Sequence, residues 1–184
     1  MNRLTKSDYI NFDKCLNTGR RLINSDKQSL IGFYIIVSIN TGLRISDVLR
    51  LKWSDLMTED LVIKEKKTNK IRTIKINPTI HSALSKFNPI DEDDFIFKSQ
   101  KGTVFSVQQI NRVLKEIFKT ESKHLNVSSH SLRKSFGRRV YENNNESEKS
   151  LVYLSELFNH TSLSITRKYL GIRQEELNDI YLSL

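Results

Sequence analysis

The chain has 184 residues, enough for one domain with a substantial core. Its 30 Lys and Arg residues against 21 Asp and Glu give a formal charge of +9, which favours a polyanionic partner but does not separate DNA, RNA and membrane surfaces. The sequence contains no run of the roughly 20 apolar residues that a membrane span needs, no signal-peptide core and only one cysteine, Cys15, so we expect a cytosolic protein without a disulfide or a multi-cysteine zinc site.

Two helices are predicted in the first part of the chain. Residues 5–17 have a helical spacing of apolar positions, and Gly19 is expected to end that helix. Residues 25–40 begin with a candidate cap at Ser25 and then become almost wholly apolar as far as Gly42. This pattern predicts a buried central helix that stops at a glycine.

A short helix is predicted next. Ser46 is a candidate N-cap, and apolar side chains follow it at Val48, Leu49 and Leu51. Arg44 is therefore expected on the turn that enters this helix, where the unpaired backbone N–H groups of a helix start favour a phosphate.

The clearest strand pair lies in the middle of the chain. Residues 61–65 and 71–76 alternate apolar and polar side chains and flank the string KKTNK. They predict a hairpin with a lysine-rich tip, and residues 95–97 are a candidate third strand.

The second half of the chain is predicted to be helical, with a polar loop at 143–150 and a terminal helix that carries an apolar stripe. The predicted helices span residues 78–87, 106–119, 129–142, 151–158 and 162–170, a last one follows from Arg173, and its stripe consists of Leu177, Ile180, Tyr181 and Leu184.

Several residues are suited to act together on a phosphate. His130 and Arg133 are neighbours on one helix face because of their spacing, and the guanidinium of Arg44 can bind two phosphate oxygens. Tyr169 is a candidate nucleophile, although a tyrosine needs nearby cations and a base because its ordinary pKa is about 10. Each signal is weak alone, since surface arginines and core tyrosines are common.

The combination of TGLRIS, HSLR and NHTSLSITRKY is more specific, and it resembles the catalytic domain of the tyrosine recombinases, the phage integrase family. The resemblance extends from about Ser25 to the end of the chain. It implies an α+β fold that is mainly helical with a small antiparallel β-sheet, and a catalytic domain over residues 1–184 without the family's N-terminal core-binding domain. The chain is then either an excised fragment or a naturally short, single-domain recombinase.

The resemblance also implies the site residues. The positions that match the family's catalytic groups are Arg44, Lys67, His130, Arg133, His160 and Tyr169. Lys66, Lys67 and Lys70 all compete for the family's hairpin lysine, and Lys67 is preferred because KT followed by a basic strand resembles the integrase pattern. The chain departs from the commonest pattern at Asn159, where many members have Gly and where we expect a positive φ, and at Lys134, where many have His.

The implied chemistry is cleavage and rejoining of double-stranded DNA through a 3′-phosphotyrosyl intermediate. Tyr169 would attack the phosphorus, His130 would accept its proton, and Lys67 would protonate the departing 5′ oxygen. The two arginines and the second histidine of the motifs would stabilise the developing charge, so the resemblance implies neither a metal nor another cofactor. His81 and His124 lie outside every motif and receive no role.

Several outcomes stay open from the sequence. The sequence does not distinguish integration, excision and inversion. The alternatives are a single-domain DNA invertase, supercoil relaxation of the type IB topoisomerase kind, and a catalytically idle DNA-binding module. The apolar stripe of the last helix predicts either packing on its own core or docking into a neighbouring copy, since the family exchanges this segment in a tetramer on DNA.

Overall fold

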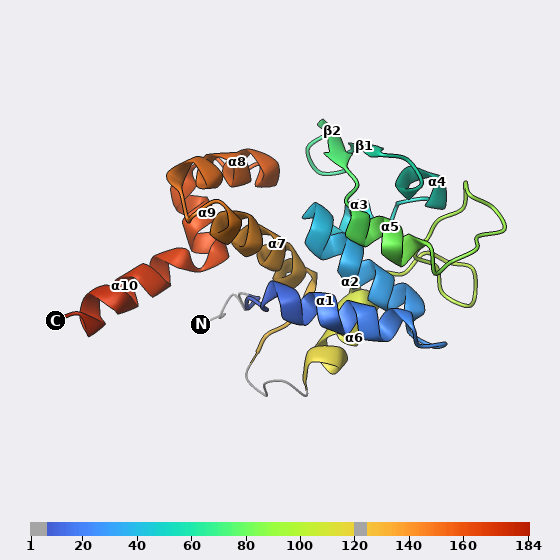
Figure 1. Cartoon of the computed structure of the whole chain (residues 1–184), viewed down its shortest axis with the longest axis horizontal. Helices are drawn as coiled ribbons and strands as arrows, with labels where there is room; N and C mark the ends of the chain where they lie inside the picture. Colours follow the sequence, from blue (N-terminus) through green and yellow to red (C-terminus); the bar gives the residue numbers. More distant parts are fainter. Residues whose placement is uncertain (1–6, 120–124) are drawn as a thin grey trace.

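The computed structural model describes residues 7–119 and 125–184, and only the backbone of 173–177. It is mostly helical with one two-stranded antiparallel sheet, which confirms the predicted fold class (Figure 1). The helices are α1 (Phe12–Ile23), α2 (Ser29–Thr41), α3 (Ile45–Val48), α4 (Trp53–Leu56), α5 (Pro78–Leu84), α6 (Val107–Lys119), α7 (Ser129–Asn143), α8 (Glu148–Phe158), α9 (Leu163–Leu170) and α10 (Ile172–Leu182), and the strands are β1 (Asp60–Lys64) and β2 (Ile71–Lys75). In the part that the structure describes, no helix has the length and apolar content needed to cross a bilayer.

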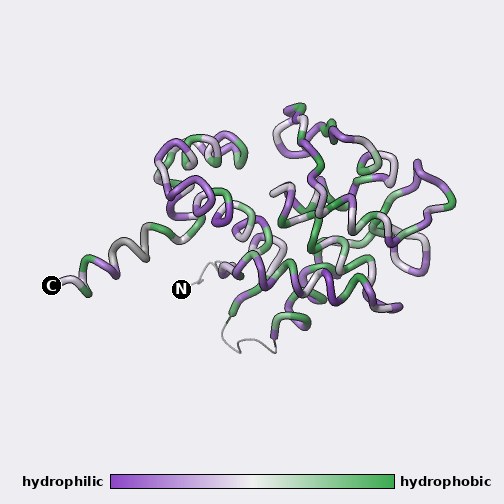
Figure 2. Tube along the Cα trace, in the orientation of Figure 1, coloured by the Kyte–Doolittle hydropathy of each residue, from purple (hydrophilic) through white to green (hydrophobic). Residues whose placement is uncertain are grey.

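The central helix is α2, as predicted, and its apolar run lies at the centre of the fold (Figure 2). It ends at Gly42, which adopts the left-handed conformation with φ of 60°. The prediction that Gly19 ends the first helix is wrong, because α1 continues to Ile23. Gly19 instead lies where α1 meets α2: a Cβ on Gly32 would come within 2.6 Å of the Gly19 carbonyl oxygen, so the two glycines permit the close approach of the helices.

Two predicted caps are also wrong. The chain turns after Ser25, and α2 starts later, after Gln28, without a side-chain cap. Helix α3 begins at Ile45, so Arg44 rather than Ser46 is its N-cap residue. The placement of Arg44 on the turn that enters this helix is therefore confirmed, two positions closer to the helix than predicted.

The hairpin is confirmed. Strands β1 and β2 pair antiparallel, with Leu61 opposite Ile74 and Lys64 opposite Ile71. The third strand predicted at 95–97 is not part of this sheet, because Phe95 forms only an isolated bridge with Lys52. Ile96 and Phe97 of this segment are buried in the helical core instead, whereas Phe95 is exposed.

The later helices agree with the prediction except at their ends. Helix α5 stops at Leu84, and α8 begins inside the predicted loop because the Ser147 side chain accepts a hydrogen bond from the Ser150 N–H and caps the helix. His124 and the first two residues of the predicted first helix lie outside the described residues.

The terminal helix α10 points away from the rest of the molecule (Figure 1). Ile180, Tyr181 and Leu184 are 57%, 74% and 99% exposed, so these members of the predicted stripe do not cover the chain's own core. The side chain of Leu177, the fourth member, lies outside the described residues.

The apolar core consists of two clusters. The larger one takes buried side chains from between Ile10 and Leu132, and the smaller one takes them from between Tyr141 and Ile172. Helix α7 connects them, because it packs on α1 and α2 as well as on α8 and α9, and it provides Leu132 to the larger cluster and Tyr141 to the smaller one. The candidate site lies at this junction.

Candidate active site

A cavity of about 360 Å³ brings together the residues predicted from the motifs. It is lined by Arg44, Lys67, Thr68, Lys70, His130, Arg133, Phe158, Asn159, His160 and Tyr169. These side chains come from the start of α3, the hairpin tip, the start of α7, the end of α8 and α9. All of the predicted site residues therefore share one cavity, although they are far apart in the sequence.

Arg44 is held at both ends of its guanidinium. Its Nη1 donates to Glu65 Oε2 at 2.8 Å, and its Nη2 donates to the carbonyl oxygen of Phe158 at 2.9 Å. The remaining N–H groups are available to a ligand in the cavity, since a guanidinium has five. The side chain is only 18% exposed, which limits competition from water.

Arg133 is buried at the back of the cavity. It donates a hydrogen bond to the carbonyl oxygen of Gly42, and its guanidinium lies 4.4 Å from the centre of the Phe158 ring. Burial lowers the pKa of Arg133 to about 10, so the side chain keeps its charge at neutral pH. The glycine of the TGLR string thus ends α2 and positions the second arginine.

His130 lies in the first turn of α7. The Ser128 side chain caps this helix and accepts a hydrogen bond from the His130 N–H. Burial lowers the pKa of the His130 imidazole below its usual value, and the positive charges of Arg133 and Lys134 lower it further. The imidazole is therefore neutral near pH 7, the form that can accept a proton.

His160 and Tyr169 pack around the Phe158 ring. The ring centres of His160 and Phe158 are 5.5 Å apart, and those of Tyr169 and Phe158 are 5.4 Å apart. His160 Nδ1 lies 3.0 Å from Thr166 Oγ1, which leaves Nε2 as the ring nitrogen for a ligand. Burial lowers the pKa of His160, with further contributions from Arg133 and Arg44.

The Tyr169 hydroxyl is buried, and within the described part of the chain it makes no hydrogen bond of normal geometry. Burial raises the pKa of Tyr169 to about 12, and the nearby charges of Arg133 and Arg44 oppose this only in part. An unpaired buried hydroxyl is costly, which is typical of a group kept for chemistry rather than for packing.

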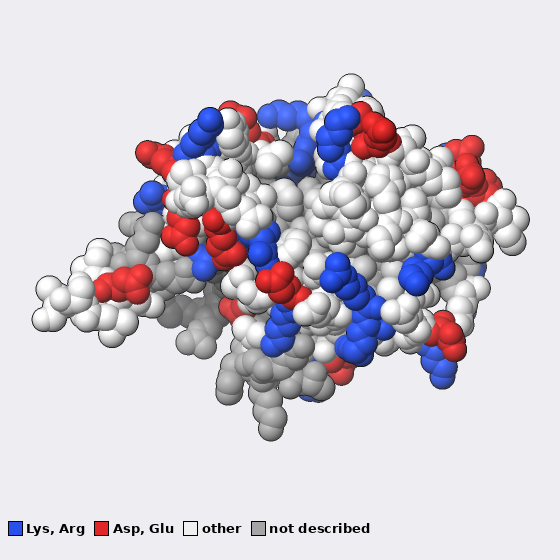
Figure 3. Space-filling model, viewed as in Figure 1, with Lys and Arg blue, Asp and Glu red and all other residues white. Residues whose placement is uncertain are grey.

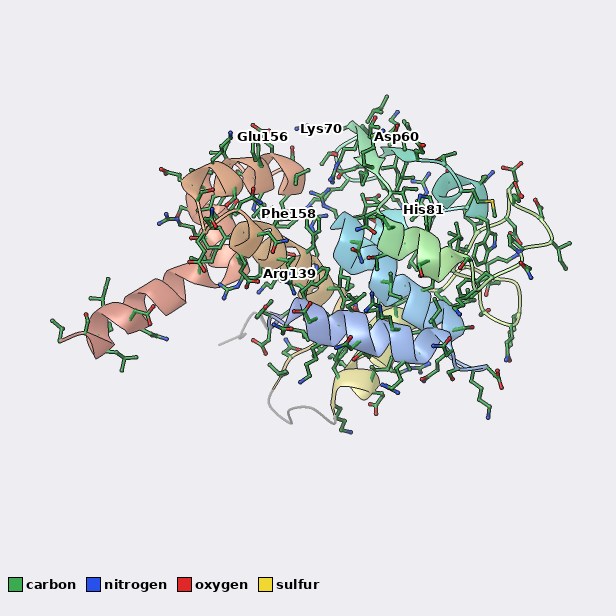
Figure 4. All side chains as sticks on the ribbon, in the orientation of Figure 1. Asp60, Lys70, His81, Arg139, Glu156 and Phe158 are labelled. Carbon is green, nitrogen blue, oxygen red and sulfur yellow. The ribbon has the colours of Figure 1, made fainter. Side chains whose placement is uncertain are left out.

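The hairpin lysines differ in their contacts. Lys70 Nζ donates to Asn159 Oδ1 at 2.6 Å, a contact that reaches from the hairpin toward the end of α8, where Phe158 lies (Figure 4). Asn159 has φ of 55°, as predicted from its place in the motif. Lys67 lines the cavity and its ammonium has no partner among the described residues. Lys66 does not line the cavity, and its backbone N–H donates to Asp47 Oδ1 at 2.9 Å.

Sequence reasoning missed several side chains that support the site. Glu65 accepts hydrogen bonds from Arg44 and Arg72, and Phe158 contacts both histidine and tyrosine rings of the motifs. The one available signal was Glu65 itself, an acidic residue directly before a lysine-rich string. In the described residues, no group of three or more His, Cys, Asp and Glu side chains is arranged to hold a metal ion.

Comparison with known proteins identifies the family. The sequence model of the phage integrase family matches residues 9–176. The chain belongs to that family. Among its relatives, the probable integrase/recombinase YoeC of Bacillus subtilis is 31% identical over 172 residues, which cover 92% of this integrase-family chain and 91% of YoeC. The tyrosine recombinase XerH of Campylobacter jejuni is 27% identical over 150 residues, 78% of this chain but only 41% of XerH.

Solved structures of recombinases share the fold of this integrase-family chain. The crystal structure of XerA recombinase aligns with a TM-score of 0.70 at 19% identity, over 100% of this chain and 65% of XerA. XerH in its post-cleavage complex with a palindromic difH substrate aligns with a TM-score of 0.69 at 22% identity, over 96% of this chain and 53% of XerH. The chain thus spans about half to two thirds of these solved proteins.

Proposed function

We propose that this chain is a site-specific DNA recombinase that cleaves and rejoins double-stranded DNA through a 3′-phosphotyrosyl intermediate, and that residues 1–184 form its catalytic domain. The observation that carries the proposal is the convergence of two arginines, two histidines, a lysine and a tyrosine on one cavity in a chain of the phage integrase family. The net charge of +9 and the DNA-bound state of the solved XerH structure, which shares this fold, support DNA as the partner.

In the proposed reaction, Tyr169 Oη attacks the scissile phosphorus while the bond from phosphorus to the 5′ oxygen breaks. His130 accepts the tyrosine proton, and Lys67 donates a proton to the departing 5′ oxygen. Because the pKa of Tyr169 is raised, its proton has to leave during the attack, and the reaction therefore needs a proton acceptor such as the neutral His130 imidazole. Attack by a 5′ hydroxyl from another strand reverses these steps and rejoins the DNA without an external energy source.

Negative charge grows on the non-bridging oxygens as the phosphorus becomes five-coordinate. Arg44, Arg133 and His160 would donate hydrogen bonds to these oxygens. The two arginines are fixed by carbonyl and carboxylate acceptors before any ligand binds, so little reorganisation is needed in the transition state. Their charges replace those that divalent ions provide in many nucleases.

The lysine assignment gains support from the hairpin contacts. Lys70 is engaged by Asn159, whereas the Lys67 ammonium is unengaged within the described residues and lines the cavity. A proton donor has to reach the leaving oxygen, so the unengaged lysine fits this role better.

The exposed terminal helix supports self-association. Ile180, Tyr181 and Leu184 would be costly to leave in water, and the end of α10 is mostly free of charged side chains (Figure 3). We expect α10 to dock on a neighbouring copy in a tetramer assembled on DNA.

A suicide DNA substrate tests the proposed function. A nick placed just 3′ of the cleavage position lets the short 5′-hydroxyl product diffuse away and leaves protein bound to the DNA. We expect a covalent complex with the DNA 3′ end on Tyr169, identified by peptide mass spectrometry. Supercoil relaxation without recombinant products would instead indicate topoisomerase activity, and the absence of any covalent complex on cognate DNA would leave only a binding module.

A further inference from the structure

One carboxylate joins two parts of the candidate site. Glu65 follows β1, and its side chain is only 2% exposed. Its Oε2 accepts hydrogen bonds from Arg44 Nη1 at 2.8 Å and from Thr68 Oγ1 at 2.7 Å. Its Oε1 accepts from Arg72 Nη1 at 2.9 Å. Burial raises the pKa of Glu65, but these hydrogen bonds and charges outweigh burial and leave it below its usual value, so the group is a carboxylate at neutral pH.

The same two arginines reach the end of α8. Arg44 Nη2 donates to the carbonyl of Phe158 at 2.9 Å, and Arg72 Nη1 donates to that of Leu157 at 3.3 Å. Carbonyls at a helix C-terminus carry partial negative charge, which suits cations. They do not carry a full charge, so the two half-buried guanidinium groups would repel each other if the Glu65 carboxylate did not lie between them.

Thr68 connects the hairpin tip to the same carboxylate. Its hydroxyl shares Oε2 of Glu65 with Arg44, and the adjacent residue is Lys67. A displacement of this one oxygen would therefore move Arg44 and the backbone that carries Lys67 together. Within the described part of the chain, no acidic side chain lines the cavity, and Glu65 is the only one that forms an ion pair with Arg44.

We infer that Glu65 is a positioning residue that fixes Arg44 and the lysine-bearing hairpin tip relative to each other for DNA cleavage. This inference rests on the proposed function. Glu65 does not line the cavity, so it acts through Arg44 and Lys67 rather than on the DNA. Arg72 belongs to the same unit, because it occupies the second carboxylate oxygen and keeps the side chain from turning away from Arg44.

The substitution Glu65→Gln keeps the size of the side chain but replaces one acceptor oxygen by an amide donor, which would face an arginine or a threonine donor. We expect the rate of covalent complex formation at saturating suicide DNA to fall about 10-fold or more, since a misplacement of about 1 Å can cost 10²-fold. DNA affinity should change little. The matched control is Asp60→Asn, at the other end of β1, because Asp60 pairs with the exposed Lys75 at 2.9 Å; this variant should react like the wild type.

Two readouts separate positioning from general destabilisation. In the Arg44→Lys background, Glu65→Gln should cause little further loss of rate, whereas a full additional loss would overturn the inference. A substrate with sulfur in place of the bridging 5′ oxygen needs no proton on its leaving group. It should recover part of the Glu65→Gln defect, and a defect that the sulfur substrate leaves unchanged would overturn the link to the hairpin tip.

Thermal unfolding and circular dichroism show whether each variant folds. If Glu65→Gln does not fold, Thr68→Val takes its place, because it removes only one of the bonds to the carboxylate. Its rate should fall less and should recover with the sulfur substrate, and a rate equal to that of the wild type would overturn the link between Glu65 and the tip. If the wild-type protein forms no covalent complex, the proposed function is overturned. If the wild-type protein is active and the Glu65→Gln variant is equally active, only the inference about Glu65 is overturned.

Discussion

The ring of Tyr169 lies 5.3 Å from the ring of His160, centre to centre, with the two planes at 68°. The two rings meet edge to face, and both side chains line the cavity together with Arg44 and Arg133. The hydroxyl is buried there without a hydrogen bond of normal geometry in the described residues. The proposed nucleophile is thus held by its ring, and its oxygen is left for the substrate.

Replacement of Tyr169 by Phe should abolish the covalent complex and leave DNA affinity nearly unchanged. The protein should also become no less stable, and its free energy of unfolding should rise by up to about 1 kcal/mol, because the lost hydroxyl is buried and unpaired. Gel shift, denaturing gel electrophoresis and urea unfolding measure these three quantities. A covalent complex that persists in this variant would show that another residue is the nucleophile. The control is Tyr153→Phe, on the exposed face of α8.

Replacement of Arg133 by Ala should reduce the rate of cleavage by about 10² or more, as expected for the loss of a preorganised donor to the transition state. The reason is geometric: Gly42 and the Phe158 ring fix this guanidinium at the cavity. Single-turnover cleavage of suicide DNA measures the effect. The matched control is Arg20→Ala, on α1 and away from the cavity, and a near-normal rate for Arg133→Ala would remove that residue from the proposed site.

The two hairpin lysines should behave differently. Lys67→Ala should slow cleavage of ordinary DNA and recover on the substrate with sulfur as the leaving atom, because that substrate needs no proton donor. Lys70→Ala should show a smaller loss that the sulfur substrate does not recover, because Lys70 holds Asn159 rather than the leaving group. Parallel rate measurements of both variants on both substrates decide the assignment, and recovery of Lys70→Ala alone would exchange the roles.

Cleavage at subsaturating DNA should decline on the acid side with a midpoint below pH 6.5. Burial and the charges of Arg133 and Lys134 lower the pKa of His130 from 6.5, so the imidazole stays neutral until the pH falls below that value. A proposed general base is active in its neutral form, so activity is present above the lowered pKa and is lost as the pH falls through it. Rates between pH 5 and 8 measure the profile, and an acid midpoint above 6.5 would contradict the role of His130.

Much of the fold follows from local patterns in the sequence. The apolar run before Gly42 predicts α2 and its end, and the alternation around KKTNK predicts the hairpin. Predictions failed where a tertiary contact of a residue overrides its local conformational preference. Gly19, which locally favours a helix end, instead provides space for α2.

The candidate site could be predicted only as far as its motifs extend. Arg44 and Tyr169 belong to recognisable strings, and the structure places both at one cavity. The carboxylate that holds Arg44 and the ring that joins Arg133 to Tyr169 come from segments distant in sequence, where no periodicity connects the partners. Such contacts depend on how the two apolar clusters pack, which a linear pattern does not contain.

The division of the core between two clusters has a consequence for how activity responds to stress. Tyr169 packs on the smaller cluster around α8 and α9, and His160 contacts the Phe158 ring of that cluster, whereas Arg44 and Lys67 lie on segments next to the larger one. Small cooperative units open at lower free energy than whole domains. Mild denaturant should therefore abolish DNA cleavage by Tyr169 while most of the helical circular dichroism signal remains. Dilution of the denaturant should restore the cleavage activity and the full signal without refolding of the larger cluster.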